Sequence, residues 1–491
     1  MNYIATFDIG TTAVKGVLLD EQGTPVHWES KGIETIFQGD HKEQDPRDWY
    51  AAFQAISKGF FTKCGPDRIL GIVMSGQMQD LILLDAEGNP TRNAILYSDG
   101  RAGRQAEKIA KLVGMETLVD STGNQFEGSR PFAKLLWVKE EEPEVYQRTR
   151  RLLISSKDYV IAKLTGAYVS DVVSCSTAGL MDIRKKCWNT EWAKAVGLDN
   201  IALPKLLYAE EPAGAVLPQA ARESGYAPGT PVYAGTGDAG ATTLASGISG
   251  DGEFNINLGT SGWVACTSRE VLRREGVSNL AAMPRDIYIN VVPFFNAGNV
   301  HKWISATLTE DSKQNEKYRY VDTLLEQSTP GAGGVLFLPY LAGERFPVMD
   351  ADIKGSFIDL TPAATKQDLA RAALEGVAFS IRQGLESIGR APRKISLIGG
   401  GAKTVAWCQI LADMLGHTIS VYQNAEFLPS VAIAAAVLIA QGRAPDYKVF
   451  TDSLQNPETC VLYQPDFAAK AVYDRMYGRY CSIYPAIKQI V

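Results

Sequence analysis

The chain has 491 residues and an ordinary globular composition, with 45% hydrophobic and 21% charged residues. Its formal net charge is −6, and its charge pattern favours neither nucleic acid nor a membrane surface, so we expect a small-molecule partner. The seven cysteines lack metal-binding spacing, no apolar run is long enough to span a membrane, and the first strand begins at Tyr3, which together favour a cytoplasmic protein.

The first predicted element is a tight β-hairpin with a bend of small residues. A strand over residues 3–9 ends in Gly-Thr-Thr, and an apolar run over 14–19 follows. Glycine lets backbone N–H groups and short hydroxyls converge on an anion. The residues expected to hold phosphate here are Gly10, Thr11, Thr12 and Lys15. Asp8 would repel a polyphosphate unless a cation intervened, so it predicts Mg²⁺ nearby, held through water.

Polar residues follow the next buried strand, over 69–75. Gln77, Met78 and Gln79 come between this strand and the one that begins at Leu81. Such residues often line a cleft, so we expect them to contact a ligand, with a simple hairpin turn as the alternative.

An acidic and a basic residue stand close together a little farther along the chain. Asp99 and Arg101 are separated only by Gly100. They either pair with each other or bind substrate hydroxyls, and the sequence leaves both roles open.

An aspartate on a glycine turn is the candidate general base. Residues 231–240 read as a strand, a glycine turn and a carboxylate, and a small-residue helix over 241–246 follows. Phosphoryl transfer needs the acceptor hydroxyl in line with the γ-phosphate and a carboxylate to take its proton. Asp238 has the position for this role, and a helix N-cap is the alternative.

The first bend recurs about half a chain later, in residues 256–261. A second apolar run over 263–266 follows it, and Asn257 stands where the first copy has Asp8. We expect Gly259 and Thr260 to hold phosphate. One such turn is common, but two at matched positions predict a nucleotide clamped between two related domains.

A triple glycine follows the strand predicted over 395–398, ahead of an amphipathic helix over 405–415. Successive glycines leave room for a flat ring beside a helix N-terminus. The residues expected to contact the nucleotide base and ribose are Gly400, Gly401, Ala402 and Lys403. Near the C-terminus, the spacing of Tyr473, Tyr477, Tyr480 and Tyr484 predicts one packed face of a helix.

Strand-like and helix-like segments alternate throughout, which predicts an α/β protein. We expect two domains. Residues 1–247 carry the first phosphate hairpin and the acceptor-binding residues. Residues 248–491 carry the second hairpin, the base site and the helical tail.

On these motifs the chain resembles the FGGY carbohydrate kinases of the actin-like ATPase superfamily. Residues 131–138 match the first family signature, and residues 355–375 match the second except at Asp359, where members usually have glycine. The resemblance implies a two-domain actin-like (ribonuclease H-like) fold with its active site in the interdomain cleft. It also implies ATP and Mg²⁺ as cofactors and Asp238 as the base.

Within the family the chain is most similar to the xylulose kinases. The supporting segments are residues 76–78, 99–101, 156–159, 258–262 and 337–345. This resemblance implies ATP-dependent phosphorylation of D-xylulose to D-xylulose 5-phosphate, with Gln77, Met78, Gln79, Asp99, Arg101 and Asp238 around the sugar. It is compatible with a homodimer, since relatives are often dimers.

Two departures fall where the sugar is expected. Gln79 and Ala239 replace the His and Asn that xylulose kinases typically show, and losing an amide removes hydrogen-bond capacity toward a hydroxyl. Another ketose such as ribulose, a polyol such as glycerol, or an aldonate such as gluconate is therefore an alternative acceptor. A non-catalytic actin-like ATP-binding protein is the remote alternative.

Overall fold

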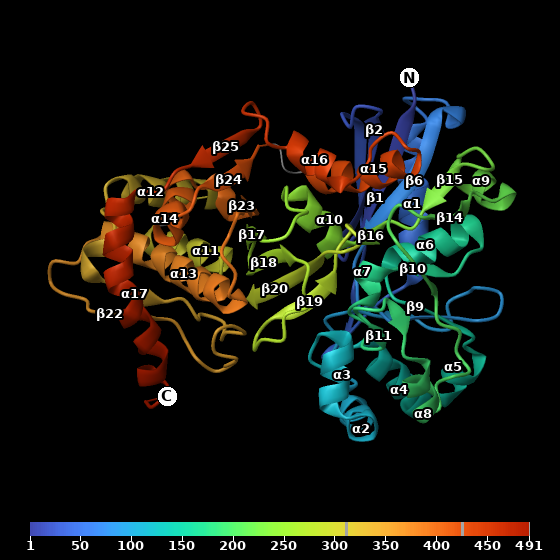
Figure 1. Cartoon of the computed structure of the whole chain (residues 1–491), viewed down its shortest axis with the longest axis horizontal. Coiled ribbons are helices and arrows are strands. Elements are labelled where there is room, and N and C mark those ends of the chain that lie inside the picture. Colours follow the sequence, from blue (N-terminus) through green and yellow to red (C-terminus); the bar gives the residue numbers. More distant parts are fainter. Residues whose placement is uncertain (310–312, 424–426, 491) are drawn as a thin grey trace.

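The computed structural model describes residues 1–309, 313–423 and 427–490. It has the predicted α/β architecture, with a mixed β-sheet in each of two lobes (Figure 1). The blue-to-green part of the chain forms most of one lobe, and the yellow-to-red part forms most of the other. No helix within the described ranges is long and apolar enough to cross a lipid bilayer.

The first sheet is built around β1, which is buried along most of its length. β1 pairs antiparallel with β2 and parallel with β6, so the first predicted hairpin is confirmed. In spatial order the strands are β14 (Pro212–Ala215), β15 (Pro231–Tyr233), β6 (Ile69–Gly76), β1 (Tyr3–Ile9), β2 (Ala13–Asp20) and β3 (Pro25–Gly32), with β16 (Thr236–Gly237) paired to β6. Because β1 and β16 both run parallel to β6, their carboxyl ends lie at one edge of the sheet.

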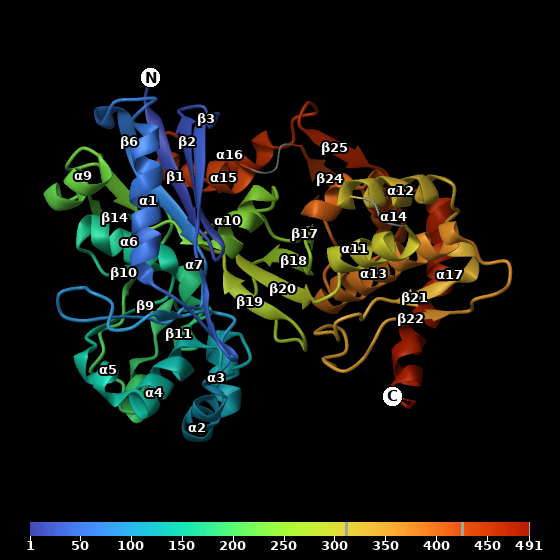
Figure 2. The same cartoon turned by 180° about the vertical axis from the view of Figure 1, so that it is seen from behind.

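Helices cover both faces of this sheet. One face packs against α1 (Pro46–Phe60), α6 (Ser156–Thr165) and α9 (Pro218–Ser224), and α1 lies in front of it in Figure 2. The other face packs against α10 (Asp238–Ala245) and α15 (Leu428–Ala440). In sequence, α15 lies between two strands of the second sheet, Ile419–Tyr422 and Cys460–Tyr463. The chain therefore returns to the first lobe within its second half, a crossing that the predicted boundary at residue 247 does not describe.

The second sheet repeats the central arrangement of the first. β17 pairs antiparallel with β18 and parallel with β23, so the second predicted hairpin is confirmed. In spatial order the strands are β19 (Ser278–Ala281), β20 (Tyr288–Phe294), β18 (Gly262–Ser268), β17 (Glu253–Leu258), β23 (Lys394–Ile398), β24 (Ile419–Tyr422) and β25 (Cys460–Tyr463).

The helices of the second lobe share one large apolar core with this sheet. They are α11 (Gly298–Leu308), α12 (Gln314–Glu326), α13 (Lys366–Ile388), α14 (Val405–Leu415) and α17 (Phe467–Ile487). α14 has the predicted bounds. α17 confirms the predicted C-terminal helix, because Tyr473 and Tyr480 are buried in the core and Tyr477 and Tyr484 pack at its edge.

Shorter elements complete the molecule, and many of them form a region below the first sheet in Figure 1 with its own apolar cluster. Besides α6, the elements between β6 and β14 are β7 (Ile82–Leu84), β8 (Ala94–Ile95), α2 (Gly103–Val113), α3 (Met115–Thr122), α4 (Pro131–Glu141), α5 (Pro143–Arg148), β9 (Arg151–Leu153), β10 (Val169–Asp171), α7 (Val172–Cys175), β11 (Met181–Asp182), β12 (Cys187–Trp188), α8 (Thr190–Ala195) and β13 (Lys205–Leu207). The others are β4 (Ile36–Gln38), β5 (His41–Gln44), β21 (Leu336–Leu338), β22 (Ser356–Ile358), α16 (Tyr447–Ser453) and 3₁₀ turns at Pro66–Arg68, Ala332–Gly334 and Gly400–Lys403.

The two lobes contact each other through the β19–β20 hairpin. Its residues Leu280 and Ile289 share an apolar cluster with Met78 of the first lobe. Two hydrogen bonds join Asn124 to Asn279: Asn124 Nδ2 donates to the Asn279 carbonyl at 2.7 Å, and the Asn279 N–H donates to Asn124 Oδ1 at 2.8 Å. The lobes are therefore joined by apolar packing and by buried hydrogen bonds.

Candidate active site

The register of the first sheet brings the two predicted acidic residues to one edge. Asp8 of β1 lies beside Ser75 of β6, and Ser75 lies beside Thr236 of β16. Asp238 comes two residues after Thr236, at the start of α10. Three neighbouring strand ends thus place Asp8 and Asp238 together, which the sequence could only suggest from their glycine turns.

Asp8 is half-buried beneath the first hairpin turn. Burial raises the pKa of its carboxyl, while a hydrogen bond from Ser75 and the charge of Lys15 act in the opposite direction. Ser75 Oγ donates to Asp8 Oδ1 at 2.9 Å. Lys15 lies directly across the hairpin from Asp8, on the exposed side where a phosphate group would approach.

Asp238 is the first residue of α10, so this helix begins three residues before its predicted start. Its carboxylate accepts a hydrogen bond from the Ala239 N–H at 2.7 Å, and the N-cap itself is Gly237. The surrounding protein desolvates the carboxyl, and the nearby charge of Asp8 adds to this effect, which raises the pKa of Asp238 to about 7. The residue remains open to solvent. A carboxylate with these properties can accept a proton near neutral pH.

A buried ion cluster supports the turn that carries Asp238. Asp171 Oδ1 accepts the Gly237 N–H at 3.3 Å. Lys157 Nζ lies 2.8 Å from Asp171 Oδ2 and 2.7 Å from Asp158 Oδ1, and all three side chains are fully buried or nearly so. The sequence did not identify Asp171, which lies in no recognisable motif. Residues 156–159 supported the family resemblance, but their part in an ion cluster was not predicted.

Gln77 fixes the first hairpin turn from below. Its Oε1 accepts from Thr11 Oγ1 at 2.7 Å, and its Nε2 donates to Gln44 Oε1 at 2.9 Å. Gln44 in turn donates to the Thr11 carbonyl at 2.7 Å. Because Gln77 is only 1% exposed, we assign it to positioning the hairpin rather than to presenting its amide to a ligand. Gln44 gave no signal in the sequence.

Met78 lies beside the turn that carries Asp238, and Gln79 follows Met78 in sequence. A Cβ atom added to Gly237 would come within 2.3 Å of Met78 Sδ, so the Met78 side chain packs directly on this turn. Gln79 has a left-handed backbone, with φ of 63°. Its side chain is half-buried and bonds to Ser129 and Arg130 at the start of α4.

Asp99 and Arg101 pair with each other, which is one of the two roles that the sequence left open. Asp99 accepts hydrogen bonds from the Arg101 backbone and guanidinium and from the Lys42 N–H. Arg101 also pairs with Glu43 at 2.8 Å. These bonds occupy both oxygens of Asp99, so we assign the pair a structural role.

The second lobe presents the second hairpin turn next to the glycine-rich segment. β17 and β23 are parallel, and Gly399 lies so close to the end of β17 that an added Cβ would come within 2.6 Å of the Leu258 carbonyl carbon. Thr260 is exposed, and an added Cβ on Gly400 would meet open space. The predicted nucleotide residues Gly259, Thr260, Gly400, Gly401, Ala402 and Lys403 are therefore gathered at one edge of this sheet.

The start of α11 also reaches the second hairpin turn. The Gly298 N–H donates to the Gly259 carbonyl at 2.7 Å, and the Asn299 N–H donates to the Thr260 carbonyl at 3.0 Å. Sequence reasoning did not identify Gly298 as part of the site, because no repeat or motif marks it.

The residues present fit a magnesium ion held together with a nucleotide. The described ranges contain no group of three or more His, Cys, Asp or Glu side chains that could hold a metal ion alone. Mg²⁺ in nucleotide sites is commonly bound by one or two carboxylates together with phosphates and water. Asp8, with its raised pKa and its acidic neighbour Asp238, offers this kind of partial site.

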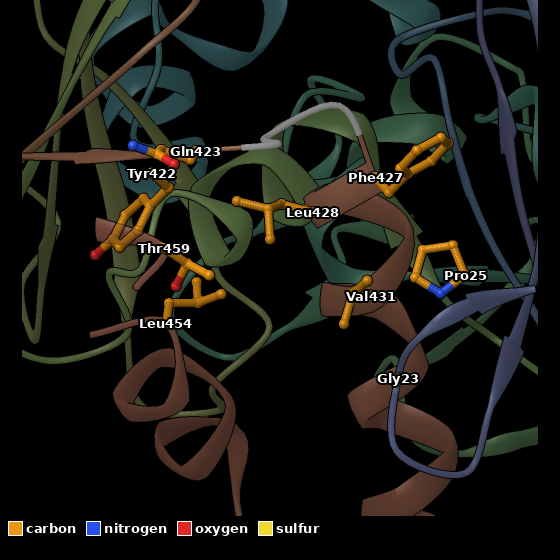
Figure 3. A pocket seen from close by; sticks show the side chains of 9 residues that line it. All are labelled: Gly23, Pro25, Tyr422, Gln423, Phe427, Leu428, Val431, Leu454 and Thr459. Atoms are coloured by element: carbon orange, nitrogen blue, oxygen red, sulfur yellow. The ribbon is translucent and has the colours of Figure 1, made fainter. Parts of the chain in front are cut away.

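A cavity of about 500 Å³ lies apart from these residues (Figure 3). It opens between the β2–β3 turn of the first lobe, the start of α15 and the end of β24. Its lining consists of Gly23, Pro25, Tyr422, Gln423, Phe427, Leu428, Val431, Leu454 and Thr459. None of the predicted site residues lines it, and we assign it no part in the chemistry.

Comparison with known proteins matches both lobes to one family. The description "FGGY family of carbohydrate kinases, N-terminal domain" fits residues 3–245, and the corresponding C-terminal domain fits residues 254–439. The xylulose kinase of Staphylococcus xylosus is 30% identical over 450 residues, which are 90% of this chain and 91% of that protein. The gluconokinase of Bacillus licheniformis is 28% identical over 92% of this chain and 90% of that protein.

A solved structure agrees with these sequence matches. The crystal structure of xylulose kinase from Rhodospirillum rubrum superposes with a TM-score of 0.91 at 26% identity, covering 100% of this chain and 99% of that one. The agreement extends over both lobes, including their relative placement.

Proposed function

The chain belongs to the FGGY family of carbohydrate kinases and is a sugar kinase, and on this basis we propose that it transfers the γ-phosphoryl group of ATP to a terminal hydroxyl of an open-chain sugar. The bond from the γ-phosphorus to the ADP oxygen breaks, a bond to the acceptor oxygen forms, and the hydroxyl proton passes to Asp238. The products are ADP and a sugar phosphate.

The observation that carries this proposal is the place of Asp238. Its carboxylate stands at an edge shared with Asp8 and the first hairpin turn, and its pKa of about 7 suits proton transfer at neutral pH. Asp171 holds the preceding residue, Gly237, so the base is fixed before substrate arrives. Preorganised groups of this kind lower the barrier without reorganising during the reaction.

The two hairpin turns are suited to the phosphates of ATP. The first turn offers the backbone N–H groups of Thr11 and Thr12 and the Thr12 hydroxyl, because the Gly10 N–H donates to the Ala13 carbonyl and the Thr11 hydroxyl donates to Gln77. The second turn offers the backbone of Gly259 and Thr260 and the exposed Thr260 hydroxyl. Closure of the lobes over the nucleotide would exclude water that competes with the sugar as acceptor. Mg²⁺ beside Asp8 would neutralise charge on the phosphate oxygens.

The relatives are named for two kinds of acceptor, a neutral ketose and a sugar acid. D-Xylulose is the neutral candidate that the family resemblance implies, and gluconate is the acidic one. Gln79 and Ala239 depart from the xylulose kinase pattern where an acceptor would lie, which leaves room for either kind.

Sugar-dependent ADP release from ATP tests the proposal, with ketoses, polyols and aldonates as acceptors. We expect Asp238→Asn to lower kcat by about 10²–10⁴-fold, the usual range for loss of a general base, with ATP binding retained. Asp67→Asn is the matched control, because the Asp67 side chain is 77% exposed and should leave turnover unchanged. Wild-type turnover in Asp238→Asn would exclude the assignment.

A further inference from the structure

The first turn of α4 and its N-cap bury two basic side chains outside any ion pair. Arg130 is 9% exposed and Lys134 is fully buried. Among the described residues, neither has a carboxylate oxygen within the 4.0 Å that defines a salt bridge. Buried charges in proteins are normally paired, so two buried basic side chains without a carboxylate in contact are unusual.

The guanidinium of Arg130 is oriented but not neutralised. Its Nε donates to the Gln125 carbonyl at 3.2 Å, and its Nη1 donates to Gln79 Oε1 at 3.0 Å. Nη2 donates to no group in the part of the chain that the structure describes. Gln79 is itself held by Ser129, since its Nε2 donates to Ser129 Oγ at 2.7 Å. The Gln79 side chain therefore fixes the orientation of the Arg130 guanidinium, which has further N–H groups that donate to none of the described residues.

The acidic residues nearby do not neutralise Arg130. Glu127 is the acid whose charge Arg130 feels, but Glu127 is exposed and accepts the Ser129 hydroxyl at 2.8 Å. Asp80 is the main acid acting on Lys134, and burial lowers the pKa of Lys134 to about 7 against that attraction. Arg130 therefore carries a positive charge that no neighbouring carboxylate among the described residues neutralises.

This cluster lies close to the turn that carries Asp238. Gln79 follows Met78, which packs on Gly237, the residue before Asp238. Asp80 is near enough to Asp238 for the charge of Asp238 to raise the pKa of the buried Asp80 carboxyl. The Arg130 guanidinium is therefore linked to the turn that carries Asp238 through Gln79 and its neighbour Met78.

We propose that Arg130, aimed by Gln79, binds a carboxylate of the acceptor, so that the substrate is an open-chain sugar acid of the aldonate class. The inference rests on the proposed function and narrows its substrate. A guanidinium matches a carboxylate with two parallel hydrogen bonds, and the pairing offsets the cost of burying its charge. A neutral hydroxyl supplies no such compensation. The departures from the xylulose kinase pattern at Gln79 and Ala239 would then reflect an acceptor that carries a carboxylate at one end.

Matched acceptors provide the test. ATP-dependent phosphorylation would be measured for aldonates of four to six carbons against neutral partners of the same length, such as D-gluconate against D-glucitol and D-xylonate against D-xylulose. We expect the best acid to exceed every neutral compound in kcat/KM by at least about tenfold. A neutral compound as the best acceptor would overturn the inference and leave the kinase intact.

Substitution of the arginine separates recognition from folding. Arg130→Met should lower kcat/KM for the preferred acid by about 10²–10³-fold, mainly through KM, and change turnover of neutral sugars less than about threefold. Arg130→Lys should recover part of the loss because it restores the charge. Arg104→Met is the control, since this side chain is 71% exposed and pairs with Glu141 at the surface. An equal loss for acidic and neutral acceptors in Arg130→Met would contradict the inference.

A binding measurement without turnover completes the test. In thermal unfolding without ATP, D-gluconate or the best acid should raise the Tm of the wild type, its neutral partner should do so less, and Arg130→Met should abolish the difference. If no acceptor of either class yields ADP, the proposed function fails, whereas a shift specific to the carboxylate would still support the Arg130 site. Equal shifts for acid and neutral partner in the wild type would refute that site.

Discussion

Asp238 combines access to solvent with an environment that raises its pKa to about 7. It is open to solvent at the start of α10, yet desolvation and the charge of Asp8 raise its pKa to about 7. The sequence predicted this residue because a carboxylate between glycines can approach a substrate closely. It could not predict the raised pKa, which depends first on desolvation by the folded protein and then on the charges of Asp8 and Asp171 from other strands.

The raised pKa predicts the pH dependence of turnover. Only ionised Asp238 can take the proton of the acceptor hydroxyl, so kcat/KM should be nearly constant above pH 7 and fall about tenfold per pH unit below it. Initial rates between pH 5.5 and 8.5 at saturating ATP would measure the profile. Asp238→Asn should lose this acidic limb along with most of its activity. A wild-type profile that stays flat down to pH 5.5 would contradict the assignment.

At the scale of elements, strand ends and helix starts hold the site together. The sequence predicted β1, β2, β6, β18, β23 and α14 closely, because each is an apolar or amphipathic segment bounded by glycine or polar residues. The contacts between elements were not predictable from those patterns. Gln44 of β5, Asp171 of β10 and Gly298 of α11 come from parts of the chain without a repeat or recognised motif.

The buried cluster that joins α6 to β10 should contribute strongly to stability. Lys157→Met would leave Asp158 and Asp171 buried without their cation, and we expect the free energy of unfolding to fall by about 3–5 kcal/mol. Urea denaturation would measure the loss. Lys448→Met is the matched control, because it breaks an exposed i,i+4 pair with Asp452 that solvent screens and that should contribute little to stability. Similar small losses in both variants would show that the cluster has no special role.

The contact between α11 and the second hairpin predicts an effect on nucleotide binding. A Cβ added by Gly298→Ala would lie 2.4 Å from the Gly259 carbonyl oxygen, so the turn must shift. We expect KM for ATP to rise about tenfold, equivalent to about 1.4 kcal/mol, while KM for the acceptor stays within about twofold. Gly478→Ala on α17 meets open space and serves as control. An unchanged KM for ATP in Gly298→Ala would argue against phosphate binding at this turn.

At the scale of the whole molecule, two sheets with the same central hairpin present their turns from two lobes. The near-repeat of residues 7–12 in 256–261 predicted this arrangement, and the confirmed hairpins account for it. The return of α15 to the first sheet was not predictable, because its apolar sequence is equally compatible with either core. α15 packs on the first lobe because β1, β6 and α10 provide a complementary apolar surface there. A local sequence pattern carries no information about that surface.

The central claim is that these two turns grip the phosphates of ATP while Asp238 takes the proton of the acceptor. A crystal structure with a non-hydrolysable ATP analogue, Mg²⁺ and an acceptor sugar tests it most directly. The account predicts the β- and γ-phosphates between residues 10–12 and 259–261, with a terminal hydroxyl of the acceptor about 2.6–3.2 Å from the Asp238 carboxylate. A triphosphate bound away from both turns, or an acceptor hydroxyl beyond the reach of Asp238, would contradict it.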